Sequence, residues 1–525
     1  MEPRCQPATA AVPAWRTLSL DESLRSGAKH VSPGTAPGFT TSAMKTNFTS
    51  FNLRMIAAAV LTVGSPSLRA QENSPGEALY QQVCASCHGA QLQGGQAQSL
   101  VDGIWQFGSG RNDIIRNIKH GVPDFSMPAF EAALSDQQIA QVVDFLKAAE
   151  KTAGISKPPP PEQFTSLDYE VAVERWIPEG LNLPWALAMA ADGRAFVTER
   201  AGGLRVITNG KLHPDPVAGT PAVLHEGQGG LLDVALDPDY AGNGWVYLCY
   251  SHALADGNGG RPTAMTRVVR GRIRDHRWVD QQTVFEAPHE SYLGTRHHYG
   301  SRIVFDHDGY LHFSIGDRGQ MHDAQDPALP NGKVHRLHPD GSVPEGNPFI
   351  GRPRALPSVF SFGHRNPQGL AVDPRTGRVW DSEHGPMGGD ELNLLEGGRN
   401  YGWPLATYGR EYSGAKITDV RRRLGFESPI LYWNPSPAVC GMEFVTGDLF
   451  PRWRNKLLVG ALKYEEIRLL TIEGDRVLHQ EILLKNAGRV RDVACDSSGA
   501  VHVVLNGPDM ILRLTPIRDM HEGVE

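Results

Sequence analysis

Residues 303–317 read IVFDHDGYLHFSIGD and carry a pattern that recurs through most of the chain. It consists of an apolar strand, a turn built from Asp and Gly, and a second apolar strand, which is the pattern of a β-hairpin. Similar copies start at Leu187, Leu232, Ile303, Leu370, Met442 and Val493. Their spacing of about 45–70 residues leaves room for two further strands in each unit, as in the blades of a β-propeller.

The six repeats therefore predict an all-β, six-bladed propeller over residues 167–518. The alternative is a β-sandwich or a β-solenoid in which the repeats are coincidental. The regular recurrence of the turn favours the propeller. With 57 Gly and 38 Pro, the chain is rich in turns, which fits a fold of many short strands.

A smaller all-α domain is expected before the propeller, at residues 74–150. Residues 78–86 and 112–120 are typical of short helices, and Ser135 is a candidate N-cap for a third helix. A run of four prolines ends near residue 161 and predicts an extended, semi-rigid linker over residues 151–166. The chain is therefore expected to be multidomain.

The N-terminal segment indicates export. Residues 55–64 form an apolar run that is too short to span a bilayer and is typical of a secretory signal. We expect the signal to occupy residues 44–70, with Met44 as the true start and residues 1–43 as a mis-extended gene model; a disordered tail is the alternative. The mature protein is then expected to be periplasmic, without stable membrane insertion.

The formal net charge of −7 argues against a nucleic-acid partner, which would require a basic surface. A more specific signal is the motif Cys84-Ala-Ser-Cys87-His88. Two thiols at this spacing can add to the vinyl groups of haem, and the adjacent imidazole can bind the iron. A zinc half-site lacks a second Cys/His pair nearby, and a redox dithiol lacks a βαβ context. The motif predicts covalent haem c.

The sixth iron ligand is expected to be Met127, the only methionine between His88 and Ala153. Its segment, SMPAF, resembles the methionine loop of small class I c-type cytochromes. His120 is the competing ligand, and a gap-filling core methionine is the alternative role for Met127. A haem held by two side chains has no open coordination site, so it should carry electrons and not bind substrate.

In the propeller, His298 precedes the hairpin 303–317 and Asp317 closes it. Side chains at these two positions can meet, which gives a base and the group that orients it; two unrelated surface residues are the alternative. The Gly-rich, acidic stretch 382–393 offers hard oxygen ligands suited to calcium, or acidic turns without an ion. Lys463, with a pair of arginines near residue 490, suggests either surface salt bridges or a multi-carboxylate cofactor.

Long motifs in this region resemble the soluble quinoprotein aldose sugar dehydrogenases, which use pyrroloquinoline quinone (PQQ). They are GQGGLLDVALDPDY, HHYGSR, SIGD, GHRNPQGLA, EHGPMGGDELN, NYGWPLATYG, SPAVCGMEF and GALK, in the order of the family. The resemblance covers nearly all of residues 167–518 and implies the same six-bladed propeller that the repeats predict.

The resemblance implies specific roles. His298 would be the general base, Asp317 would hold its imidazole, and Arg365 and Asn366 would contact the quinone, with Arg365 polarising its carbonyl. Other positions that match PQQ contacts are Gln228, Tyr412, Ala461, Leu462, Lys463, Arg489 and Arg491. Positions that match calcium ligands are the carbonyls of Gly385 and Pro386, next to PQQ, and Glu391 and Tyr401, at a second, structural calcium.

The implied function is that of a periplasmic quinohaemoprotein. It would oxidise aldoses to lactones by hydride transfer to PQQ and pass the electrons to the fused haem c, then to a soluble cytochrome or a terminal oxidase. The fused cytochrome is a departure from the family pattern. Two alternatives remain: a PQQ enzyme for another polyol, alcohol or aldehyde, and a non-catalytic carbohydrate-binding propeller.

Overall fold

The computed structural model describes residues 74–103, 105, 110–122, 127–153, 159–255, 261–412 and 414–521. The expected signal segment and the residues before it lie outside this range, as do residues 154–158 of the expected linker. Among the described residues, none of the helices combines the length and the apolar character needed to cross a bilayer.

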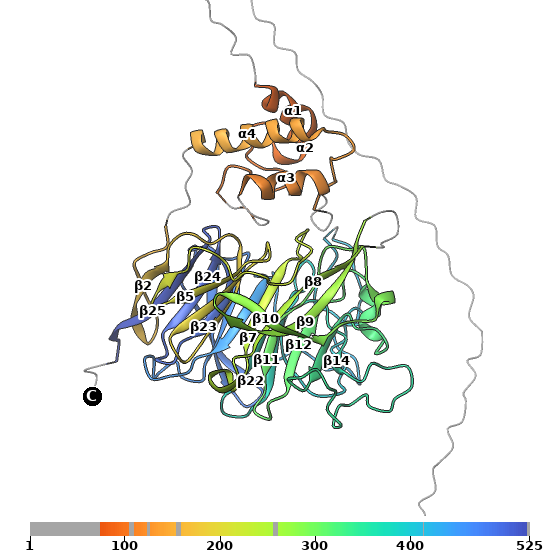
Figure 1. Cartoon of the computed structure of the whole chain (residues 1–525), viewed down its shortest axis with the longest axis vertical. Helices are drawn as coiled ribbons and strands as arrows, with labels where there is room; N and C mark the ends of the chain where they lie inside the picture. The colour runs from red at the N-terminus through yellow and green to blue at the C-terminus, as the bar shows by residue number, and fades with distance from the viewer. Residues whose placement is uncertain are drawn as a thin grey trace, which may run out of the picture. The chain divides into compact units, whose positions relative to one another are not determined.

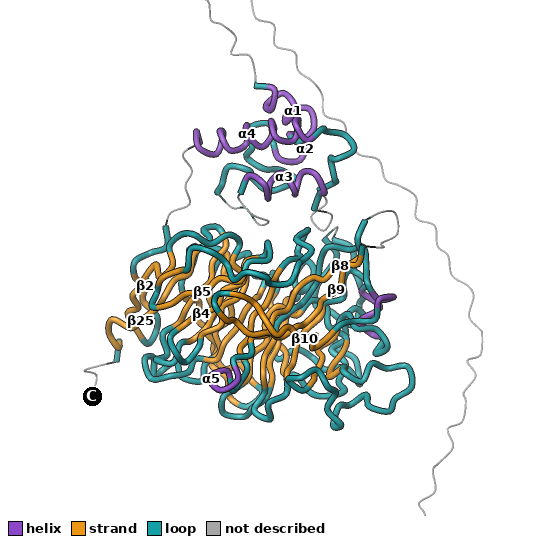
Figure 2. The backbone as a smooth tube through the Cα atoms, viewed as in Figure 1, coloured by secondary structure: helices purple, strands orange, loops and turns teal. Residues whose placement is uncertain are grey.

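The N-terminal region is helical (Figures 1 and 2). Its helices are α1 (Pro75–Val83), α2 (Ala85–His88), α3 (Arg111–His120) and α4 (Asp136–Ala153). The hydroxyl of Ser135 accepts the backbone N–H of Gln138, so the predicted N-cap is present. The apolar face of α4 is buried against the other helices; the residues of this core include Tyr80, Ile114, Ile118, Ile139, Val142, Val143 and Leu146.

The rest of the chain forms six antiparallel sheets, and the predicted six-bladed propeller is confirmed. The first three blades are β3 (Pro184–Met189), β4 (Arg194–Glu199), β5 (Leu204–Thr208) and β6 (Lys211–Leu212); β7 (Leu231–Leu236), β8 (Val246–Leu254), β9 (Thr263–Arg274) and β10 (Arg277–Phe285); and β11 (Ile303–Phe305), β12 (Leu311–Ile315), β13 (Lys333–Leu337) and β14 (Val359–Phe362).

The next two blades are β15 (Pro367–Val372), β16 (Val379–Glu383), β17 (Asp390–Leu394) and β18 (Leu431–Trp433); and β19 (Val439–Phe444), β20 (Leu457–Ala461), β21 (Glu466–Glu473) and β22 (Arg476–Leu483). Each repeat found in the sequence is the first hairpin of one blade. Short helical turns lie between some strands: α5 (Tyr240–Asn243), η3 (His289–Ser291) and η4 (Met321–Gln325).

The sixth blade closes the ring by joining distant parts of the chain. Its strands β23 (Arg489–Cys495), β24 (Val501–Asn506) and β25 (Met510–Asp519) are completed by β2 (Tyr169–Ile177) and β1 (Gln163–Thr165). The pairing of β2 with β25 runs from Tyr169 opposite Asp519 to Ile177 opposite Ile511. This pairing joins the two ends of the propeller in one sheet and so closes the ring.

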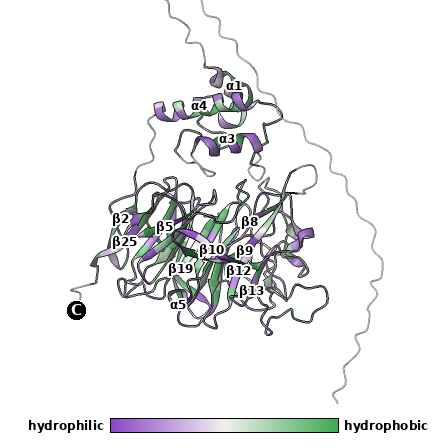
Figure 3. Ribbon diagram, in the orientation of Figure 1, coloured by the Kyte–Doolittle hydropathy of each residue, from purple (hydrophilic) through white to green (hydrophobic). Residues whose placement is uncertain are grey.

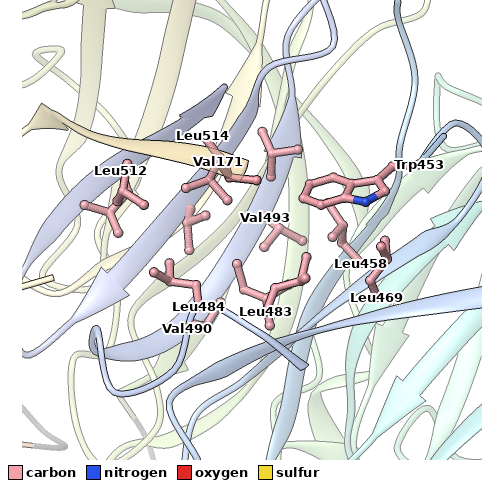
Figure 4. Close-up of a cluster of buried hydrophobic side chains, with 14 of the residues drawn as sticks. Val171, Trp453, Leu458, Leu469, Leu483, Leu484, Val490, Val493, Leu512 and Leu514 are labelled. Carbon is pink, nitrogen blue, oxygen red and sulfur yellow. The ribbon is translucent and has the colours of Figure 1, made fainter. Parts of the chain in front are cut away.

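The blades are held together by apolar side chains between their faces. Figure 3 shows apolar residues along many of the strands. In one cluster, Val171 of β2, Val493 of β23 and Leu514 of β25 pack with Trp453 and Leu458 of the fifth blade (Figure 4). Burial of both faces explains why the strands are nearly continuous apolar runs in the sequence.

At the centre of the ring, the guanidinium of Arg302 connects several blades. Its Nη1 lies 3.1 Å from an oxygen of Asp233 and 3.0 Å from an oxygen of Asp492. Its Nε donates to the carbonyl of Gln368 at 2.8 Å, and its Nη2 donates to the carbonyl of Arg491 at 2.9 Å. These partners belong to β7, β15 and β23, and Arg302 itself directly precedes β11.

The two remaining blades, which contain β3 and β19, contact Asp492 and Arg302. Asp492 accepts the backbone N–H of Leu187 in β3 at 3.0 Å. In β19, a Cβ on Gly441 would lie 2.0 Å from the carboxylate of Asp492 and 2.8 Å from Arg302, so only glycine fits there. The innermost strands of all six blades therefore converge on one buried ion-pair network.

Replacing Arg302 by methionine should lower the free energy of unfolding by about 3–5 kcal/mol, because Asp233 and Asp492 would remain buried without their counter-ion. The matched control is Arg378→Met, which breaks an exposed pair with Glu396 and should change little. Urea unfolding followed by tryptophan fluorescence measures both. Equal stability of the two variants would contradict the role given to Arg302.

Candidate functional site

A cavity of about 440 Å³ opens among the loops at one end of the blades. Ten of the residues predicted for the site line it: Gln228, His298, Arg365, Gly385, Pro386, Tyr412, Leu462, Lys463, Arg489 and Arg491. They come from five blades, because propeller loops from successive sheets meet around the central axis.

His298 and Asp317 meet as predicted. The Nδ1 atom of His298 lies 2.7 Å from Oδ1 of Asp317. His298 precedes β11 and Asp317 follows β12, so the antiparallel pairing of these strands brings the two residues to the same end of the hairpin. The backbone of His298 has φ +54, and its N–H is held by the side-chain oxygen of Gln228 at 2.8 Å. A strained backbone of this kind is common at functional sites.

The electrostatic environment keeps His298 neutral near pH 7. Burial, followed by the charge of Arg365, lowers the pKa of His298 to about 4, although Asp317 opposes the shift. Burial alone would raise the pKa of Asp317, but His298, Arg365 and the N–H of Gly319 lower it to about 2. Asp317 is thus an anion that holds the N–H tautomer at Nδ1. The Nε2 atom of His298 is left as a proton acceptor.

Arg365 is held from both ends. Its backbone N–H donates to Glu383 at 2.6 Å, and its guanidinium donates to the carbonyls of His384 at 3.1 Å and Gly385 at 3.0 Å. Asn366 does not line the cavity. Its side-chain oxygen instead accepts the N–H of Gly300 at 3.1 Å, beneath the loop of His298.

The cavity has an excess of positive charge. Its cations are Arg200, Arg365, Lys463, Arg489 and Arg491, and Asp390 is the one carboxylate among the described residues that line it. Burial, and then the charge of Arg491, lowers the pKa of Arg200 to about 9 and that of Arg489 to about 10. A ligand with several carboxylates would relieve this repulsion. Arg200 was not among the residues predicted from the sequence, because no recognisable motif marks it.

Ala461 and Tyr412 differ in how they relate to the cavity. Ala461 is fully buried in β20, so only its neighbour Leu462 reaches the wall. Tyr412 lines the rim of the cavity and is 68% exposed.

The carbonyl of Gly385, a predicted calcium ligand, accepts a hydrogen bond from the guanidinium of Arg365 in this structure. That oxygen is therefore already placed to meet a cation.

Glu391 lies in a buried acidic cluster next to the cavity. In the register of β16 with β17, Glu383 is opposite Glu391 and Asp381 is opposite Asn393, so these side chains share one face. His364, Asp381 and Glu383 place potential ligand atoms within 4.8 Å of one another.

Three buried carboxylates share a single nearby imidazole. Burial, with the charge of Glu383, raises the pKa of Asp381 to about 6 and raises that of Glu391 well above its ordinary value. Neither oxygen of Asp381 has a hydrogen-bond partner in the described residues, although His364 lies 3.2 Å away. Orphaned buried oxygens fit a cation. The phenol of Tyr401 is already bonded to the carbonyl of Leu394, so only its main chain could contribute a ligand.

In the helical region, Cys84 lies between α1 and α2, and Cys87 and His88 lie on α2. The Nδ1 atom of His88 is 2.9 Å from the carbonyl of Gln98. This bond fixes the ring and leaves Nε2 for a metal, which is the usual arrangement of a histidine ligand. Met127, the predicted sixth ligand, packs against the helical core. In His120, the competing candidate, the Nδ1 atom lies 3.4 Å from Oε2 of Glu131.

Comparisons with known proteins agree with this geometry. Residues 181–513 match the family Glucose / Sorbosone dehydrogenase, and residues 71–146 match Cytochrome C oxidase, cbb3-type, subunit III. The chain is 41% identical to the aldose sugar dehydrogenase YliI of Escherichia coli (strain K12) over 343 residues, which are 64% of this chain and 91% of that protein.

Two solved structures are also similar. The apo-form of the soluble aldose sugar dehydrogenase of Escherichia coli has a TM-score of 0.61 and 39% identity, covering 66% of this chain and 99% of that one. The PQQ-bound form of the aldose sugar dehydrogenase of Streptomyces coelicolor has a TM-score of 0.52 and 28% identity, covering 68% and 99%.

The acidic cluster predicts a response to calcium. Ca²⁺ at 100 times its dissociation constant should raise the free energy of unfolding of chelated protein by about 2.7 kcal/mol. Asp381→Asn should reduce this increment, and in EGTA the variant should be more stable than the unmodified protein, because one buried charge is gone.

The control for that experiment is Asp192→Asn, which changes an exposed carboxylate. Urea unfolding with and without Ca²⁺ gives the increment for each protein. If Asp381→Asn keeps the full calcium increment, the cluster does not bind the ion.

Proposed function

The chain belongs to the glucose/sorbosone dehydrogenase family, an oxidoreductase family, and we propose that it is a PQQ-dependent dehydrogenase that oxidises aldoses to lactones and passes the electrons to its own haem c. The observation that carries the proposal is the neutral His298, held by Asp317 in the wall of a cationic cavity. A non-catalytic carbohydrate-binding module has no use for such a dyad.

The residues of the cavity fit PQQ, a quinone with three carboxylates. Lys463, Arg489 and Arg491 would hold its carboxylates, and Arg365 would face its quinone oxygens. The carbonyls of Gly385 and Pro386 would hold the calcium beside it. When bound, PQQ supplies the acceptor for the hydride that leaves carbon 1 of the sugar.

The protein supplies the matching proton transfer. Nε2 of His298 accepts the proton of the anomeric hydroxyl as carbon 1 is oxidised, so a cyclic aldose becomes a lactone. Asp317 keeps the proton of the neutral imidazole on Nδ1 and stabilises the imidazolium that forms. Arg365 adds positive charge where negative charge develops.

In this proposal, a haem in the helical region accepts the electrons. Cys84 and Cys87 would attach the haem, and His88 and Met127 would bind its iron; the haem supplies a one-electron carrier. The match of residues 71–146 to a cytochrome family supports this assignment. Residues 44–70 support a periplasmic location, where a soluble cytochrome or a terminal oxidase would take the electrons.

His298→Ala should lower the rate of aldose-dependent haem reduction by roughly 100- to 10,000-fold, the usual effect of losing a positioned general base. Stopped-flow absorbance of the full chain with saturating PQQ and Ca²⁺, over a panel of aldoses, polyols and aldehydes, measures it. His289→Ala removes an exposed histidine outside the cavity and should keep the rate. A wild-type rate for His298→Ala would exclude His298 as the base.

The haem should be covalently attached. It should remain with the polypeptide in acid–acetone extraction of the full chain, whereas Cys84→Ser, which removes one thioether, should weaken retention. Met127→Ala should lower the haem potential and weaken the sulfur-to-iron absorption band. Haem released from the unmodified chain would contradict covalent attachment, and an unchanged Met127→Ala spectrum would assign the ligand elsewhere.

A further inference from the structure

Trp403 belongs to the motif NYGWPLATYG, and its side chain is neither the proposed base nor one of the proposed PQQ or calcium contacts. It lies in the loop between β17 and β18 and is 6% exposed. Its indole Nε1–H donates to Oδ2 of Asp317 at 2.7 Å. The indole therefore bonds directly to the carboxylate that orients His298.

The loop holds this tryptophan firmly. Its backbone N–H donates to the carbonyl of Gly363 at 2.9 Å, and its carbonyl accepts the side-chain amide of Gln325 at 2.7 Å. The guanidinium of Arg365 lies over its ring, 5.3 Å from the centroid. One side chain thus contacts both Asp317 and Arg365, and contacts of this cation–π kind are favourable.

The hydrogen bonds to Asp317 show what the indole adds. Oδ1 faces His298 and also accepts the N–H of Gly319 at 2.8 Å. Oδ2 accepts Trp403. With donors on both oxygens, the carboxylate cannot rotate about its Cβ–Cγ bond without losing a charge-assisted hydrogen bond. The plane of the carboxylate is therefore fixed toward the imidazole.

We propose that Trp403 is a positioning residue of the sugar-oxidising site: its indole N–H fixes the carboxylate of Asp317 against His298, and its ring supports the guanidinium of Arg365. This inference rests on the proposed function, in which His298 is the base. The role requires the N–H group and not merely the volume of the ring.

Space filling alone does not explain the indole–carboxylate bond. Trp380 and Trp453 are 1% and 0% exposed, and their indole nitrogens have no hydrogen-bond partner in the part of the chain that the structure describes. A buried tryptophan in this propeller can therefore lack a partner. Trp380→Phe is a matched control because it removes the same atoms without removing a hydrogen bond.

The change in acidity has a definite sign. The charged and titratable groups around His298 are Asp317, Arg365, His297 and His384. Removing the donor on Oδ2 leaves Asp317 more basic, so the imidazolium beside it becomes more stable and the pKa of His298 rises. Because His298 must be neutral to accept a proton, the acidic limb of kcat/KM should move to higher pH.

The experiment compares the full chain with Trp403→Phe and Trp380→Phe. With PQQ and Ca²⁺ bound, Trp403→Phe should lower kcat about tenfold, a typical loss for a hydrogen bond to a charged group, and shift the acidic limb upward by about half to one pH unit. In cofactor-free protein labelled at histidine Cε1, the NMR titration of His298 should shift by a similar amount. Trp380→Phe should change neither quantity.

Each outcome decides the inference. If Trp403→Phe behaves like Trp380→Phe in both titrations, Trp403 only fills space and the proposal is overturned, even though aldose oxidation stands. If no aldose reduces the haem of the unmodified chain, the proposed function fails. The NMR titration then still tests whether Trp403 lowers the pKa of His298 through Asp317.

Two further variants keep the test decisive. In an Asp317→Asn background, Trp403→Phe should cause little additional loss of kcat, because the two residues act through one contact. If Trp403→Phe does not fold, Gln325→Ala removes the side chain that holds the backbone carbonyl of Trp403, so the loop that places the indole against Asp317 loosens while the indole itself is kept. It should shift the acidic limb in the same direction by a smaller amount, and an unchanged limb would overturn the proposal.

Discussion

The structure depends on the buried guanidinium of Arg302. Six sheets that pack only through apolar faces could slide relative to one another, because apolar contacts are not directional. Arg302 adds direction: its hydrogen bonds and ion pairs reach Asp233, Gln368, Arg491 and Asp492, and each of these lies on an innermost strand. A charge buried this deeply is tolerable only when it is fully paired, so the blades are held in one arrangement.

The same ion-pair network also fixes the strands that carry the residues of the site. Asp233 also accepts the N–H of Ile303 at 2.6 Å, which fixes the start of β11 directly after the His298 loop. Arg491 joins the network through its carbonyl while its side chain lines the cavity. The cationic cavity and the neutral base are thus built on the strands that the central ion pairs align. The repulsion among the cations of the cavity is a cost that a polyanionic ligand would offset.

The sequence predicted the propeller because the hairpin is local: apolar runs and Asp/Gly turns record it directly, as in residues 303–317. The pairing of β2 with β25 was not predictable in this way, since it joins Tyr169 to Asp519. The dyad of His298 and Asp317 followed from one hairpin, whereas Arg200 and Trp403 reach the site from distant loops. Their roles depend on side-chain contacts across blades, which no local pattern records. Asn366 and Ala461 were named from resemblance, and the structure places neither in the cavity wall.

In the proposed function, oxidation of the sugar carbon in the propeller delivers electrons to the haem of the same chain. It is tested most directly by single-turnover haem reduction in the PQQ- and calcium-loaded full chain, with an aldose and with the same aldose deuterated at carbon 1. Rapid haem reduction is expected with the ordinary sugar and a slower rate with the deuterated sugar, because hydride leaves that carbon. A haem that dithionite reduces but that no aldose reduces would exclude electron transfer from sugar oxidation in the propeller to the haem.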